Sequence, residues 1–178
     1  GRTPDEIVKI CGDVSTEVAP VQAVNFNCPG QVVIAGEAGA VEKACGALKE
    51  AGARRAVMLK VSAPFHSTLM EPAAKRLKEV LDTISIHDTL IPVFANVNAK
   101  EETKADEIRK NLVDQAAHAV HWEESVRNMI AGGVDCTVEV GPGTVLSGFM
   151  RKIDRSVTNL HAEDIDTINE VVSTLKGE

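Results

Sequence analysis

One histidine has the setting of a catalytic base. His66 lies in the stretch VSAPFHSTLMEP (61–72), where a turn at a proline follows an apolar segment and a helix begins almost at once. Ser67 or Thr68 can cap that helix, and Pro72 is tolerated only in its first turn. Loops between rigid elements often carry catalytic groups, and an unperturbed imidazole titrates near neutral pH. The pattern therefore indicates general-base chemistry, with a loop histidine of no catalytic task as the alternative.

A histidine base needs a nucleophile to activate, and the sequence offers no convincing one. No G-x-S-x-G nucleophile elbow occurs. Ser147 falls in the middle of a predicted helix, and Cys28 lies in a turn beside a proline, where a half-buried structural cysteine is more common. Zinc is not indicated, because His118 and His121 are three residues apart but no cysteine or third ligand lies near them in sequence. The chain thus has a candidate base without its partner.

Composition narrows the class of protein. The chain has 178 residues, of which 44% are hydrophobic and 25% charged, as in ordinary folded proteins. Its formal net charge of -7 argues against general binding to nucleic acid or a membrane surface. No stretch approaches the roughly 20 apolar residues of a membrane span, and no basic segment leads into a signal-peptide core. The four cysteines form no C-x-x-C pair, so we expect a cytoplasmic protein with reduced thiols.

The elements that must position His66 divide near Ser62. Residues 1–62 read as helix, two strands, helix and strand, which is most of a ferredoxin-like split βαβ lobe. Residues 63–178 alternate strands and helices, which predicts a mainly parallel sheet covered on both faces. The expected helices cover residues 3–11, 41–51, 69–83, 104–118, 121–132, 144–153 and 163–176, and the expected strands cover 21–27, 31–35, 54–61, 91–96, 136–140 and 157–160.

A glycine-rich turn marks a second segment of interest. The apolar strand at 136–140 breaks at Gly141-Pro142-Gly143, and a helix follows from Thr144. Ligands of open α/β sheets bind beyond the carboxyl ends of strands, so this turn is expected to border the site. It matches neither the phosphate-binding loop of nucleoside triphosphatases nor the dinucleotide-binding fingerprint.

Four stretches taken together resemble the malonyl-CoA:acyl carrier protein transacylases of fatty-acid synthesis and the acyltransferase domains of polyketide synthases. In chain order they are NFNCPGQVVIAG (25–36), PFHSTLM (64–70), NLVDQ (111–115) followed by Trp122, and EVGPG (139–143). The resemblance implies a ferredoxin-like small lobe at 1–62. It implies the C-terminal part of an α/β-hydrolase-like domain at 63–178.

The resemblance also assigns roles to individual residues. His66 falls on the family's catalytic histidine, which takes the proton from a nucleophilic serine and later activates the incoming thiol. Gln115 falls on the residue whose main-chain carbonyl orients that imidazole. Asn25 and Asn27 fall in the segment lining the acyl pocket, and Phe65 resembles the version associated with malonyl rather than methylmalonyl units. No metal and no cofactor are implied, since the substrates are malonyl-CoA and the phosphopantetheinylated carrier protein.

Several family features are missing from the sequence. The nucleophile elbow, the oxyanion-hole glutamine and the arginine that pairs with the malonyl carboxylate should all precede Gly1, and Ala119 stands where the family often has proline. We therefore expect a portion of a malonyltransferase that is inactive alone. The alternatives are a polyketide synthase acyltransferase domain and a non-catalytic ferredoxin-like binding module.

Docking of an acidic carrier protein to this acidic chain calls for a local basic patch. Two clusters offer one: Lys75, Arg76 and Lys78 after His66, and Arg151 and Lys152, with Arg155 nearby, after the glycine-rich turn. Solvated faces and cations favoured at helix C-termini are the alternative explanation of both clusters.

Overall fold

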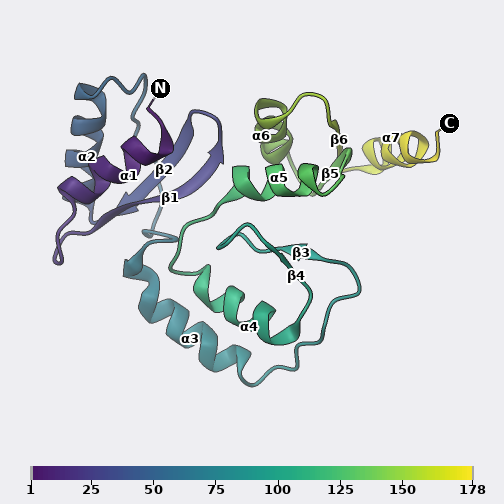
Figure 1. Cartoon of the computed structure of the whole chain (residues 1–178), viewed down its shortest axis with the longest axis horizontal. Coiled ribbons are helices and arrows are strands. Elements are labelled where there is room, and N and C mark those ends of the chain that lie inside the picture. Colours follow the sequence, from purple (N-terminus) through teal and green to yellow (C-terminus); the bar gives the residue numbers. More distant parts are fainter. Residues whose placement is uncertain (1, 178) are drawn as a thin grey trace. The chain divides into compact units, whose positions relative to one another are not determined.

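The computed structural model describes residues 2–177 and divides into two compact units, Gly1–Ser125 and Val126–Glu178 (Figure 1). Helices and strands both contribute, which confirms an α/β protein. The predicted boundary near Ser62 falls inside the first unit. None of the helices within residues 2–177 is long and apolar enough to cross a membrane.

A helix-covered hairpin begins the first unit. Strands β1 (Val21–Cys28) and β2 (Gln31–Gly36) pair antiparallel, and Gly30 at their turn has a φ of 77°. Helix α1 (Pro4–Val14) starts with a capping box between Thr3 and Glu6, and α2 (Ala38–Glu50) follows β2. Both helices contact the hairpin, and small apolar side chains fill the core between them: Cys11, Val21, Ala40, Val41 and Ala44. This part follows the sequence prediction within a few residues.

The prediction of a strand at residues 54–61 is wrong. These residues form no regular secondary structure, and Val57, Leu59 and Val61 are more than half exposed. A β-strand exists only through hydrogen bonds to a neighbouring strand, and none of the described strands pairs with this segment. The composition is strand-like, but pairing is a tertiary property that composition does not supply.

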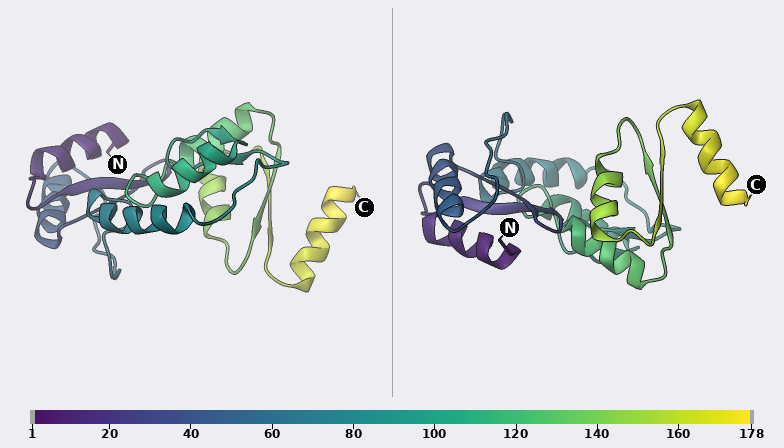
Figure 2. Two further views of the ribbon diagram at one scale, coloured as in Figure 1. Left: turned by 90° about the horizontal axis from the view of Figure 1, so that it is seen from below. Right: turned by 90° about the horizontal axis from the view of Figure 1, so that it is seen from above.

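The rest of the first unit is built around two helices. A short 3₁₀ turn, η1 (Thr68–Met70), leads into α3 (Glu71–Leu81), and α3 packs beside α4 (Ala105–Asp114) (Figure 2). The Arg109 guanidinium of α4 donates to the carbonyls of Leu81 and Ile84 at the end of α3. The predicted strand at 91–96 shrinks to β3 (Val93–Phe94), which pairs antiparallel with β4 (Glu101–Glu102). At this position the strand pairing is antiparallel rather than the expected parallel.

The second unit holds a parallel β-α-β segment. Strand β5 (Cys136–Val140) pairs in register with β6 (Thr158–Ala162), and α6 (Val145–Ile153) connects them. Helix α5 (Trp122–Ala131) spans the boundary between the units, and α7 (Ile165–Lys176) follows β6. These elements agree with the predicted pattern, and their strand pair is the only parallel two-stranded sheet among residues 2–177.

Candidate active site

His66 sits in a strained turn immediately before a helix. Its backbone φ is 63°, a left-handed conformation that is uncommon for a non-glycine residue. The neighbouring Ser67 is buried, and its hydroxyl donates to the Pro64 carbonyl across the turn (2.7 Å). Ser67 occupies the cap position of η1, but its side chain makes no capping bond, so the predicted serine cap does not form. Left-handed residues held by surrounding contacts are often found at functional sites.

The carbonyl of Gln115 orients the imidazole ring. The Nδ1 atom of His66 lies 2.8 Å from this oxygen, across 49 residues of sequence. Gln115 follows the last turn of α4, where the final carbonyls have no partner within the helix. A carbonyl can only accept, so the hydrogen is on Nδ1, and Nε2 of the neutral ring is the basic atom. The structure thus brings together the two predicted catalytic residues.

The basic Nε2 atom of His66 makes no hydrogen bond within residues 2–177, and the ring is half-buried. Neither the two nucleophiles considered from the sequence, Cys28 and Ser147, nor the adjacent Ser67 is placed to be activated by this atom. Ser67 donates its hydroxyl to Pro64, and both Cys28 and Ser147 are buried, with exposed fractions of 2%. None of these three side chains therefore contacts Nε2 as a nucleophile in the described structure.

The predicted substrate residues lie around the same segments of the first unit. Asn25 and Asn27 are half-buried on β1, and Asn25 forms a parallel bridge with Val120, which lies five residues beyond Gln115. Phe65 precedes the histidine directly and is 49% exposed. Neither asparagine hydrogen-bonds to His66 in the described structure, so their assignment to the acyl pocket stays a prediction.

Sequence reasoning missed Gln22, which contacts the segment just after the histidine. Its side-chain oxygen Oε1 accepts hydrogen bonds from the backbone nitrogen and the hydroxyl of Thr68, at 2.8 and 3.1 Å. A single glutamine in a strand is no motif, and its partner lies 46 residues away. No signal in the sequence could have identified it.

The glycine-rich turn of the second unit depends on two carboxylates. Glu139 at the end of β5 accepts from the backbone nitrogens of Leu146 and Ser147 (3.0 and 2.7 Å), which caps α6. Glu163 accepts from the nitrogen of Gly143 at 2.7 Å. Partial desolvation raises the pKa of Glu139, but the hydrogen bonds from Ser147 and Leu146 outweigh it and hold that pKa below its usual value. The turn was predicted from the sequence, and the role of Glu139 was not.

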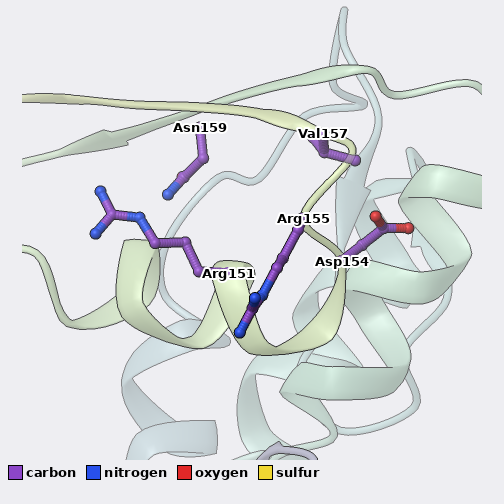
Figure 3. Close-up of a pocket in the computed structure, with 5 residues that line it drawn as sticks. All are labelled: Arg151, Asp154, Arg155, Val157 and Asn159. Atoms are coloured by element: carbon purple, nitrogen blue, oxygen red, sulfur yellow. The ribbon is translucent and has the colours of Figure 1, made fainter.

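The predicted basic clusters differ in how their charges are used. Lys78 forms an ion pair with Asp82 (2.7 Å), whereas Arg151 and Arg155 make no ion pair within residues 2–177. These two arginines line a hollow of about 420 Å³ at the end of α6 (Figure 3). The carboxylate of Asp154 there accepts from the Ser156 nitrogen and hydroxyl rather than from either arginine. The hollow therefore presents two positive charges, from Arg151 and Arg155, and one negative charge, from Asp154.

Metal ligands are not assembled in the part of the chain described. Within residues 2–177 no group of three or more histidine, cysteine or acidic side chains is placed to hold a metal ion. His118 contacts the Asp114 carbonyl through Nδ1 (2.7 Å), and the ring of His121 stacks on Phe26. The two histidines considered for zinc thus have other contacts.

Curated proteins of one name resemble the chain over most of its length, although no family model matches it. The malonyl CoA-acyl carrier protein transacylase of Bacillus subtilis is 44% identical over 178 residues, which is 100% of this chain and 56% of that protein. The Escherichia coli K12 protein of the same name is 47% identical over 158 residues, covering 89% of this chain and 51% of that protein.

Solved structures show the same relationship. An acyl-carrier-protein S-malonyltransferase from Burkholderia pseudomallei matches 97% of this chain and 56% of its own, with a TM-score of 0.93 and 39% identity. A structure described as a type II polyketide acyl-carrier protein in complex with its malonyl-transacylase also matches. The match covers 100% of this chain and 56% of the solved chain, with a TM-score of 0.92 and 40% identity. The chain spans slightly more than half the length of the relatives it matches. The chain belongs to the malonyl-CoA:acyl carrier protein transacylase family.

Proposed function

We propose that the chain supplies the general base of a malonyl-CoA:acyl carrier protein acyltransferase of fatty-acid synthesis. The nucleophilic serine lies on a part of the enzyme outside residues 1–178. One observation carries the proposal: the Gln115 carbonyl holds Nδ1 of His66 at 2.8 Å, which makes Nε2 the basic atom. The names of the relatives supply the reaction type and the substrates.

The proposed reaction has two halves, and in each half Nε2 of His66 takes up a proton and then releases it. Nε2 of His66 takes the proton of the serine hydroxyl as the serine attacks the malonyl thioester, and the proton then goes to the departing coenzyme A thiolate. In the second half, Nε2 takes the proton of the phosphopantetheine thiol, which attacks the serine ester, and the proton returns to the serine. The Gln115 carbonyl steadies the imidazolium through Nδ1–H in both steps. General-base help of this kind contributes about 10²–10⁴-fold in rate.

Substrate recognition is assigned to neighbouring residues of the first unit. Asn25 and Asn27 are proposed to line the acyl pocket from β1. The ring of Phe65, beside the base, is proposed to disfavour an α-methyl branch and so to favour malonyl units. No cofactor or metal takes part in this scheme, and a cytoplasmic setting fits the scattered cysteines of the sequence.

The proposed protein partner is the acyl carrier protein. A solved relative is described as a carrier protein in complex with its malonyl-transacylase. In this chain, two arginines and one carboxylate, Asp154, line the hollow at the end of α6, so its formal charge is positive. Arg151 in this hollow and Lys152, its neighbour in the sequence, are the proposed docking residues for an acidic carrier, with Lys75, Arg76 and Lys78 as a second cluster. Because the carrier protein in that complex is described as a type II polyketide one, a polyketide synthase acyltransferase is the second candidate. Activity toward the two kinds of carrier separates the two candidates.

Intact-mass measurement tests whether the nucleophile lies outside residues 1–178. The full-length enzyme should gain one malonyl group from malonyl-CoA and pass it to carrier protein, whereas isolated residues 1–178 should gain none. An adduct on the isolated chain at Ser67, Cys28 or Ser147 would show that the nucleophile is misplaced. Absence of transfer by the full-length enzyme to either type of carrier would overturn the proposed function and would favour a non-catalytic module.

A further inference from the structure

The segment that carries His66 has little support on its N-terminal side. Residues 54–61 have no regular secondary structure and are largely exposed. Within the turn, the Ser67 backbone nitrogen and hydroxyl both contact the Pro64 carbonyl, but these bonds are internal to the turn and do not attach it to its surroundings. The left-handed backbone of His66 (φ 63°) is unfavourable for a non-glycine residue. Contacts from elsewhere must hold it in place.

Gln22 supplies such a contact on the C-terminal side. The side chain is half-buried on β1, and its Oε1 atom accepts both from the Thr68 nitrogen (2.8 Å) and from the Thr68 hydroxyl (3.1 Å). Thr68 begins η1 and lies two residues after His66. One acceptor atom therefore fixes the position and orientation of the residue at which the turn joins the helix.

Strand β1 also holds the segment that follows Gln115. The Val120 nitrogen donates to the Val24 carbonyl (2.8 Å), and the Phe26 nitrogen donates to the Val120 carbonyl (2.9 Å). Val120 follows Gln115 by five residues, so β1 holds the segment that carries the orienting carbonyl. Both segments that meet at the His66–Gln115 contact are thus attached to β1. The segment after Gln115 is attached through backbone hydrogen bonds, and the segment after His66 is attached through the Gln22 side chain.

We propose that Gln22 is a positioning residue for the histidine base. Its amide oxygen fixes Thr68, which keeps His66 in the left-handed turn with Nδ1 directed at the Gln115 carbonyl. The inference rests on the proposed function only in taking His66 as the base. Only the oxygen of the amide is used, so an oxygen acceptor of the same length should replace it and an apolar side chain of that length should not.

The test compares two substitutions at this position in the full-length enzyme. Gln22→Glu keeps an oxygen that accepts both bonds, and Gln22→Met removes the acceptor at nearly the same side-chain length. Thr83→Val is the matched control, because Thr83 also donates a hydroxyl hydrogen bond (to Val80) but lies at the far end of α3. Measurements are kcat and KM for malonyl-CoA, the melting temperature, and the ¹⁵N spectrum of the His66 imidazole.

Gln22→Met removes both hydrogen bonds to Thr68 and should lower kcat at least about tenfold, since one hydrogen bond of ordinary strength already corresponds to about tenfold, and it should leave the KM for malonyl-CoA within about twofold of the parent. Its imidazole spectrum should show a smaller fraction of the Nδ1–H tautomer. Gln22→Glu and Thr83→Val should match the parent in kcat and in the imidazole spectrum. Parental kcat and spectrum in Gln22→Met would overturn the proposal, and so would equal losses in the Met and Glu variants accompanied by equal drops in melting temperature.

Failure of the positioning role is distinguishable from failure of the proposed function. If removal of the His66 imidazole left transfer intact, the assignment of the base would fail whatever Gln22 did. The imidazole spectrum would still report whether Gln22 sets the tautomer, because that measurement does not depend on turnover. Unchanged spectra together with a strong loss of transfer in the His66 variant would refute the Gln22 inference alone.

Discussion

Replacement of His66 separates its chemical role from its structural one. The residue combines a left-handed backbone (φ 63°) with a hydrogen bond from Nδ1 to the Gln115 carbonyl (2.8 Å). Asparagine adopts this backbone more readily than other non-glycine residues, whereas alanine has no such preference. His66→Asn therefore removes the base while favouring the turn, and His66→Ala removes the base without this compensation.

The expected magnitudes differ for rate and stability. Loss of a general base should lower malonyl transfer by about 10²–10⁴-fold in both variants, which raises the activation free energy by roughly 3–5 kcal/mol. Loss of the bond to Gln115 should lower the free energy of unfolding by about 1 kcal/mol. The left-handed turn should make His66→Ala less stable than His66→Asn by up to about 1 kcal/mol. Rate should thus fall equally in the two variants while stability does not.

The assay is steady-state transfer from malonyl-CoA to carrier protein by the full-length enzyme, with thermal unfolding of each variant measured in parallel. Transfer within a few-fold of the parent in either variant would refute the assignment of the base. A loss of rate that followed stability, large in the alanine variant and small in the asparagine variant, would show that His66 acts only through the fold of its turn.

Two further predictions concern the second unit. Glu139→Gln should lower the free energy of unfolding by about 1 kcal/mol, because a charged cap on the Leu146 and Ser147 nitrogens becomes neutral. Since folding lowers the pKa of Glu139 from its ordinary 4.5, this contribution is present above that pH and disappears as the pH falls through the folded-state pKa. Denaturant unfolding of parent and variant at pH 7 and at pH 3 checks it, and a difference that persisted unchanged at pH 3 would contradict it. Charge reversal at Arg151 and Lys152 should raise the KM for carrier protein several-fold, weaken its dependence on salt, and leave the KM for malonyl-CoA unchanged. Equal effects on both substrates would instead indicate damage to the active site, and no effect on either would place the dock elsewhere.

Much of the local structure follows from the sequence because it depends on neighbours along the chain. Helix α1 begins at Thr3-Pro4 as the capping pattern predicts, and α3 starts near Pro72. The turn at Gly30 joins the predicted hairpin, and residues 136–140 form the predicted strand β5. The setting of His66 on a turn before a helix was equally readable, since prolines and caps act within a few residues.

Residues 54–61 show where this reasoning stops. Their β-branched composition predicted a strand, but a strand requires a partner, and pairing depends on residues far away in the sequence. The site depends on the tertiary structure in the same way. Gln115 was assigned through resemblance to a family, and its contact with His66 crosses 49 residues.

The sequence by itself indicated His66 as the candidate base and predicted the local turn that presents it. Only the tertiary structure decided which nitrogen of the ring is basic, because the Gln115 carbonyl reaches Nδ1 from the end of another helix. It alone revealed Gln22, whose oxygen meets Thr68 across 46 residues. Caps and turns are set by contacts within a few residues, whereas the orientation of a side chain is set by groups that only folding brings within hydrogen-bond distance.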